Sequence, residues 1–189
     1  MGEIVLCLRN ENMLTPEGHV QIKGGSKSGK TNLLRSLIYT HLTNPLNSTI
    51  PVTLYADREG EYRDLLNFPT MFSTTSILQL KESAGLIVID VDSDCSKEIA
   101  QLLAHGVGES IILYIGNLPR KEDLGFKHLL YTGGLDDEEF EGKPSLAIST
   151  PGLVSWETKE GLLCVYRVPF LPMHKKFISA NSGGRRSEI

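Results

Sequence analysis

The sequence predicts an α/β fold in which helices flank a mostly parallel sheet. Two continuous apolar runs, residues 85–90 and 110–115, lack the alternation of a strand with one exposed face. Such runs are typical of strands buried on both faces of a parallel sheet. Helical patterns alternate with the strand-like segments, which favours βαβ units. A glycine-rich turn at residues 24–31 joins a strand pattern to a helical one.

Composition and charge narrow the class of protein. The chain has 189 residues, of which 40% are hydrophobic and 22% charged, and this excludes wholesale disorder and a fibrous repeat. We expect one domain over residues 1–178 and a disordered tail over 179–189. The formal net charge of −4 offers no general attraction to nucleic acid, so we do not expect DNA as a partner.

The sequence lacks signals for a membrane span, for secretion and for a cysteine metal site. Its apolar runs are far shorter than the ~20 residues that cross a bilayer. The N-terminus lacks the basic start and apolar stretch of a secretory signal, so we expect a cytoplasmic protein. Cys7, Cys95 and Cys164 are far apart and odd in number, which argues against a disulfide framework and a cysteine metal site.

The first half of the chain reads as strand, glycine loop, helix and strand. Residues 3–9 and 19–22 have strand patterns, and residues 52–56 form the next predicted strand. The helix after the loop ends at Asn44, because the residue before Pro45 is pushed out of the α region. Its inward face is expected to carry Leu34, Leu37, Ile38 and Leu42.

The second half begins with the two buried strands, 85–90 and 110–115, and a helix between them. Ser93 can cap that helix, which runs through residue 105, and Gly106 can stop it. Further on, short strands with glycine-rich or charged turns predict antiparallel additions at one edge of the sheet. These strands cover residues 146–149, 153–156 and 162–168.

Residues 24–31 satisfy the pattern G-x-x-x-x-G-K-[ST], after a short strand and at the start of a helix. In such a phosphate-binding loop, or P-loop, backbone N–H groups turn toward phosphate oxygens and the helix dipole favours negative charge. Lys30 can reach the β and γ phosphates, and the Thr31 hydroxyl can ligate Mg²⁺. The alternative is a glycine turn that merely starts a helix. The candidate nucleotide-binding residues are Gly24, Gly25, Ser26, Lys27, Ser28, Gly29, Lys30, Thr31 and Asn32.

Asp90 closes a buried strand, where P-loop proteins place the acidic residue that holds magnesium through water. With Thr31 it forms the candidate magnesium pair, although a strand-end aspartate can also be a plain helix-entry residue. Many hydrolytic families carry a glutamate after this aspartate to polarise the attacking water, and this chain has Val91. Asp92 or Asp94 could substitute, but both also suit the start of the next helix. The pattern therefore predicts nucleotide binding and leaves hydrolysis open.

Three segments together resemble the FtsK/SpoIIIE–HerA superfamily of ring-forming motor ATPases: residues 24–31, 57–62 and 88–90. The second of them, Asp-Arg-Glu-Gly-Glu-Tyr, is similar to the family's D-P-x-G-E-[YF] element, with Arg58 in place of proline. Residues 115–119 occupy the place of its T-Q-R-P element, which implies that Asn117 contacts the γ-phosphate side. Leu118 replaces the arginine. The resemblance implies a RecA-like P-loop NTPase that binds ATP and Mg²⁺.

The chain also looks like the degenerate C-terminal ATPase domains of the membrane-anchored EssC/EccC proteins of type VII secretion. The missing acidic residue at position 91 and the missing arginine at position 118 fit such a copy. This resemblance implies a weakly active or inactive ATPase module of a protein-export motor, in the cytosolic part of a membrane-anchored protein. The partners it implies are other ATPase domains of the same chain or ring, and an exported protein.

Two other functions stay open at this point. In an active ring-forming translocase of DNA or protein, Glu61 or Glu59 would activate water in place of residue 91. In a nucleotide-independent scaffold, a groove near Trp156 and Phe170 would dock an export signal, although both aromatics also suit core or edge packing. Five arginines are either fingers that reach a neighbouring subunit's phosphate or solvated surface residues: Arg9, Arg35, Arg63, Arg120 and Arg167.

Overall fold

A computed structural model describes residues 6–9, 12–14, 18–25, 27–91, 96–116, 126–132, 153–158 and 161–167. In this part of the chain, strands alternate with α-helices and short 3-10 helices, the latter labelled η. In chain order the elements are β1 (Leu6–Arg9), β2 (Asn12–Leu14), β3 (His19–Lys23), α1 (Lys30–Thr43), β4 (Val52–Ala56), η1 (Glu59–Tyr62), η2 (Leu65–Asn67), β5 (Met71–Ser73), η3 (Ile77–Glu82), β6 (Leu86–Asp90), α2 (Ser96–His105), β7 (Ile111–Ile115), β8 (Phe126–Thr132), β9 (Leu153–Thr158) and β10 (Gly161–Arg167).

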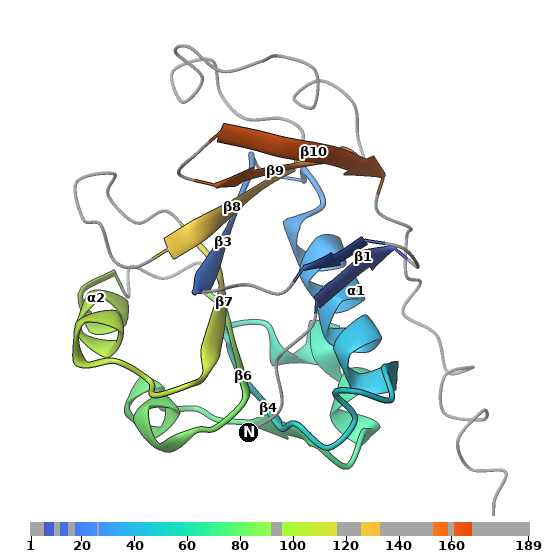
Figure 1. Ribbon diagram of the computed structural model, residues 1–189. Coiled ribbons are helices and arrows are strands. Elements are labelled where there is room, and N and C mark those ends of the chain that lie inside the picture. Colours follow the sequence, from blue (N-terminus) through green and yellow to red (C-terminus); the bar gives the residue numbers. More distant parts are fainter. Residues whose placement is uncertain are drawn as a thin grey trace, which may run out of the picture.

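Within the described residues, the strands form an eight-stranded sheet and a separate two-stranded hairpin, β1–β2 (Figure 1). The order in the large sheet is β10-β9-β8-β3-β7-β6-β4-β5. The strands from β8 to β5 run parallel to one another, whereas β9 and β10 are antiparallel additions at one edge. This arrangement confirms the predicted fold class, a mostly parallel α/β sheet with antiparallel strands near the C-terminus.

Helices cover both faces of the parallel strands, with α1 on one face and α2 on the other (Figure 1). Along β6, Leu86 and Val88 belong to the buried cluster that includes the apolar residues of α1. Ile87 and Ile89 belong to the cluster on the α2 side. Successive side chains of a strand point to opposite faces, so a strand covered on both sides needs a continuous apolar run.

The strand order brings the two predicted parts of the site to the same end of the sheet. β7 lies between β3 and β6, where Ile115 pairs with Ile22 on one side and with Asp90 on the other. Because these strands are parallel, their carboxyl ends lie at the same end of the sheet, and ligands of open α/β sheets bind outside these ends. The glycine loop after β3 and Asp90 at the end of β6 therefore lie at this same end of the sheet.

Most predicted elements are confirmed with boundaries that shift by a residue or so. Residues 52–56 are β4, and the runs 85–90 and 110–115 become β6 and β7. The helix after the loop ends as predicted, since its C-cap Asn44 is already extended before Pro45. The predicted strand at 146–149, the start of the predicted helix at 93–95 and the predicted tail at 179–189 lie outside the described residues.

The sequence patterns do not predict three of the strands, β2, β5 and β8. β2 and β5 have three residues each, and two of the three residues in β5 are exposed. β8 carries Lys127 and His128 in its first half, so it does not read as a buried parallel strand although it pairs with β3. In the described part of the chain, no helix is long and apolar enough to cross a membrane.

Candidate functional site

The glycine loop turns the chain from β3 directly into α1. Gly29 is the N-cap of α1 and has a left-handed backbone, with φ of 96°, where glycine avoids the strain of a side chain. Its carbonyl accepts the Leu33 N–H at 2.9 Å, the first bond of the helix. Before it, the Ser28 N–H donates to Gly25 O at 3.3 Å. Ser26, a predicted phosphate-binding residue, lies outside the described residues.

Lys30, the first residue of α1, folds its side chain back over this loop. Its Nζ donates to the carbonyl oxygens of Gly24 and Gly25, at 2.7 Å in both cases. The two bonds hold a positive charge beside the loop and at the N-terminus of α1, where the helix dipole also favours an anion. An anion in the loop would therefore meet a cation that is already in place.

The loop is tied to the end of β8, which the sequence did not point to. Ser28 Oγ and Thr132 Oγ1 are 2.5 Å apart, and Thr132 Oγ1 donates to Lys23 O at 3.2 Å. Gly24 lies against both hydroxyls and has φ of 156°. A Cβ at Gly24 would collide with Thr132 Oγ1 and Ser28 Oγ. This close approach explains why this chain needs a glycine at position 24.

Replacing Gly24 with alanine is expected to destabilise the fold and to disturb the loop. The added methyl must push apart the Ser28 and Thr132 hydroxyls on a backbone that side chains rarely adopt, which costs about 1–3 kcal/mol. Gly60→Ala is the matched control, because Gly60 is exposed and a Cβ there meets nothing within 4 Å. Urea unfolding should show a loss for Gly24→Ala only. Equal unfolding free energies of the two variants would contradict the close approach.

Asp90 closes β6 on the face that α1 covers, since it follows Leu86 and Val88 in the strand alternation. Its Oδ2 accepts a short hydrogen bond from the Tyr62 hydroxyl, and its carbonyl accepts the Asp57 N–H at 3.1 Å. Tyr62 is fully buried. Burial, followed by the charge of Asp90, raises the pKa of Tyr62 above its usual range, so the phenol keeps its proton and is the donor.

Val91 follows Asp90 and is buried, with an exposed fraction of 5%. It belongs to the apolar cluster on the α2 side, together with Ile99 and Leu102. This apolar surrounding, given by the described residues, disfavours a carboxylate at position 91. The alternatives Asp92 and Asp94 lie outside the described residues.

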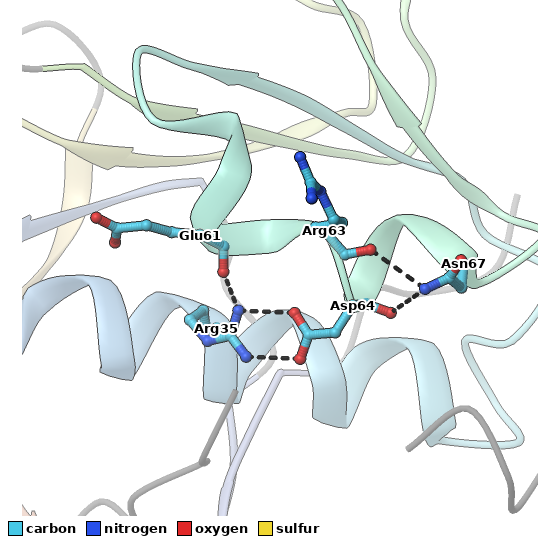
Figure 2. A network of polar contacts seen from close by, with 5 residues as sticks. All are labelled: Arg35, Glu61, Arg63, Asp64 and Asn67. Atoms are coloured by element: carbon cyan, nitrogen blue, oxygen red, sulfur yellow. Dashed lines mark hydrogen bonds and ion pairs between the residues drawn. The ribbon is translucent and has the colours of Figure 1, made fainter. Parts of the chain in front are cut away.

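Glu61 and the segment after β4 are held by Arg35 of α1 (Figure 2). Arg35 Nη1 donates to the Glu61 carbonyl and also to Asp64 Oδ1, at 2.9 Å from the latter. Its Nη2 donates to Asp64 Oδ2 at 2.7 Å. We call these bonds between Arg35, the Glu61 carbonyl and Asp64 the Arg35 clamp. The Arg35 side chain is 4% exposed. Both open readings of Arg35, a finger for a neighbouring subunit and a solvated residue, are therefore wrong: it is a buried partner of Asp64.

The Glu61 side chain is not part of this clamp. Its Oε1 lies 3.9 Å from Arg58 Nη1, and the side chain is 32% exposed. In Figure 2 it points away from Arg63 and Asp64. The main chain of Glu61 is thus fixed while its carboxylate is partly exposed. Arg63 is exposed, which suits both a finger for a neighbouring subunit and a solvated residue.

The residues around the loop fit a nucleotide phosphate with its magnesium. Lys30 supplies a cation beside the loop at the N-terminus of α1, where the helix dipole also favours a phosphate. Thr31 follows Lys30 on α1 and Asp90 ends β6 at the same end of the sheet. Among the described residues, no group of three or more His, Cys, Asp or Glu could hold a metal ion by itself. Mg²⁺ usually takes one or two protein ligands together with substrate phosphates and water, which a pair such as Thr31 and Asp90 suits.

Other predicted site residues are only partly described. Asn117 lies one residue beyond the described Gly116, whose carbonyl accepts Gln21 Nε2 at 3.1 Å. Trp156 is half-buried and donates from Nε1 to His128 Nδ1 at 3.2 Å, so its indole is engaged within the sheet. Phe170, Arg120 and the side chains of Arg9 and Arg167 lie outside the described part of the chain.

Comparison with known proteins gives structural matches. No family model and no curated protein sequence matches the chain. A structure of EssC ATPase domains 2 and 3 from Geobacillus thermodenitrificans has a TM-score of 0.61 and 13% identity, over 95% of this chain and 46% of that one. The cytoplasmic domain of the type VII secretion ATPase EccC from Thermomonospora curvata has a TM-score of 0.59 and 14% identity, over 90% and 26%. A cytoplasmic domain of EssC has a TM-score of 0.56 and 15% identity, over 89% and 43%.

The chain spans less than half the length of each of these structures. At 13–15% identity, the likeness shows the fold. The chain therefore has the α/β fold of the cytoplasmic ATPase domains of EccC and EssC, and it resembles them as the sequence motifs implied.

Proposed function

We propose that this chain is an ATP-binding P-loop domain of the FtsK/SpoIIIE type that holds Mg-ATP or Mg-ADP and hydrolyses ATP weakly or not at all. The observation that carries the proposal is the Lys30 ammonium, 2.7 Å from the carbonyls of both Gly24 and Gly25. A fixed cation within a glycine loop, at a helix N-terminus and beside a parallel strand, suits the phosphates of a nucleotide.

Each residue has a distinct part in this proposal. Residues 24–31 and Asn32 bind the phosphates, and Lys30 neutralises their charge. Thr31 and Asp90 hold magnesium, and Asn117 contacts the γ-phosphate side. Bound magnesium would supply further charge neutralisation on the β and γ phosphates. Adenine as the base comes from the family resemblance.

Weak hydrolysis is supported by what surrounds Asp90. The next residue, Val91, is buried in the core and has no group that can polarise water. In the motor hypothesis the Glu61 carboxylate polarises water in place of residue 91. The ion pair described for this carboxylate is with Arg58, at 3.9 Å. We therefore favour a regulatory or assembly role for the bound nucleotide over a motor stroke.

The similar structures support a place in a type VII secretion motor. One of them holds two ATPase domains, and this chain spans 26–46% of their lengths. We infer that the chain works beside other ATPase domains of the same chain or ring, in the cytoplasm, and that an exported protein is the eventual partner.

Calorimetric titration tests the proposal directly. Mg-ATP and Mg-ADP are expected to bind the purified chain with a Kd well below the millimolar ATP of a cell, and phosphate release in the same samples should stay near background. Removal of Mg²⁺ with EDTA should weaken binding, because Thr31 and Asp90 then lose their cation. Absence of binding at millimolar nucleotide would overturn the proposal and favour the scaffold alternative. Rapid phosphate release, lost in Glu61→Gln, would instead favour the motor alternative.

A further inference from the structure

The contact between Tyr62 and Asp90 joins two segments that the nucleotide site needs in a fixed relation. Tyr62 ends η1, and its ring belongs to the buried cluster on the α1 face of the sheet. Asp90 lies at the carboxyl end of β6 on the same face. The Tyr62 hydroxyl donates to Asp90 Oδ2, so a buried neutral group fixes one carboxylate oxygen.

Tyr62 is itself held from both sides by Arg35. The guanidinium binds the carbonyl of Glu61, immediately before Tyr62, and the carboxylate of Asp64, two residues after it (Figure 2). A planar guanidinium that bonds a carboxylate through two parallel N–H groups fixes direction as well as distance. The main chain that carries Tyr62 is thus fastened to α1.

Arg35 belongs to the helix that starts in the glycine loop. It follows Thr31 by four residues, so the two side chains lie on the same side of α1, one turn apart. The hydrogen bonds of Arg35 and Tyr62 therefore link α1 to Asp90. The helix α1 also carries Thr31, so the linkage joins the two elements that hold the residues to which we assign magnesium.

We propose that Tyr62 is a positioning residue that sets the orientation of the Asp90 carboxylate toward magnesium, and that Arg35 fixes Tyr62 for this task. The inference rests on the proposed function, because it gives Asp90 its role. A hydroxyl donor suits the task, since it orients a carboxylate without neutralising its charge. Mutation of a residue that hydrogen-bonds to a metal ligand typically lowers metal affinity by about 10–100-fold.

Tyr62→Phe tests the inference, because it keeps the buried ring and removes only the hydroxyl. Calorimetry should show that ADP binding in the presence of Mg²⁺ weakens about tenfold or more, with binding in EDTA unchanged. The Mg²⁺ concentration at half-maximal ADP affinity should rise by a similar factor. Tyr39→Phe is the matched control, since Tyr39 also packs on this core cluster but belongs to the middle of α1. It should leave the Mg²⁺ dependence unaltered.

A double-mutant cycle in the nucleotide-free chain checks the contact itself. Melting temperatures of Tyr62→Phe, Asp90→Ala and the double variant should be non-additive, since each single change removes the same hydrogen bond. Additive shifts would overturn the contact. An equal loss of ADP affinity with and without Mg²⁺, or no loss, would overturn the positioning role while leaving the proposed function intact. No nucleotide binding by the wild-type chain would overturn the proposed function, and this inference with it.

Discussion

Lys30→Ala is expected to abolish the rise in melting temperature that Mg-ATP gives to the wild-type chain. A ligand at a concentration a hundredfold above its Kd stabilises a protein by about 2.7 kcal/mol. The variant would lose that gain, because the phosphates would face the carbonyls of Gly24 and Gly25 without the cation that now lies 2.7 Å from them. Thermal melting with and without saturating Mg-ATP measures the effect.

Lys81→Ala is the control for this prediction. Lys81 is an exposed lysine in η3, outside the loop, so its replacement makes the same change in net charge without touching the site. It should keep the full nucleotide-induced shift. An unchanged shift in Lys30→Ala would contradict the assigned pocket and place any bound nucleotide elsewhere on the chain.

Arg35→Ala is expected to lower the free energy of unfolding by about 3 kcal/mol, a large part of a typical domain's stability. Removal of the guanidinium leaves the Asp64 carboxylate and the Glu61 carbonyl without the donor that now satisfies them. The value lies at the lower end of the range for a broken buried ion pair, because Asp64 is still 15% exposed and can recruit water. Urea unfolding measures the loss.

Arg63→Ala and a double variant complete this test. Arg63 is exposed in the same segment, where its carbonyl accepts Asn67 Nδ2 at 3.2 Å, a bond that the alanine variant keeps (Figure 2). Removal of the Arg63 side chain should change the free energy of unfolding by less than about 0.5 kcal/mol. Arg35→Met with Asp64→Leu should be more stable than Arg35→Ala, since no charge is then left unpaired. Similar unfolding curves for Arg35→Ala and Arg63→Ala would contradict the clamp.

The sequence by itself determined the loop, the helix that follows it and the buried strands. The glycine loop is recognisable because its glycines, lysine and threonine are neighbours in the chain, and Asp90 because it ends a continuous apolar run. The end of α1 at Asn44 follows from Pro45, a constraint that acts on the adjacent residue. Signals of this kind depend on a few consecutive side chains, so they can be recognised without knowledge of the tertiary structure.

Only the tertiary structure decided which of these residues are in contact and which side chains link them. Ser28 contacts Thr132 over 104 residues, from a strand with a polar first half that no periodicity marked. Tyr62 reaches Asp90 over 28 residues, and Arg35 reaches Asp64 over 29. An arginine that could be a surface finger by sequence is buried as a clamp instead. Pairings of this kind depend on strand order and on the packing of α1 against the sheet, which local spacing along the chain does not encode.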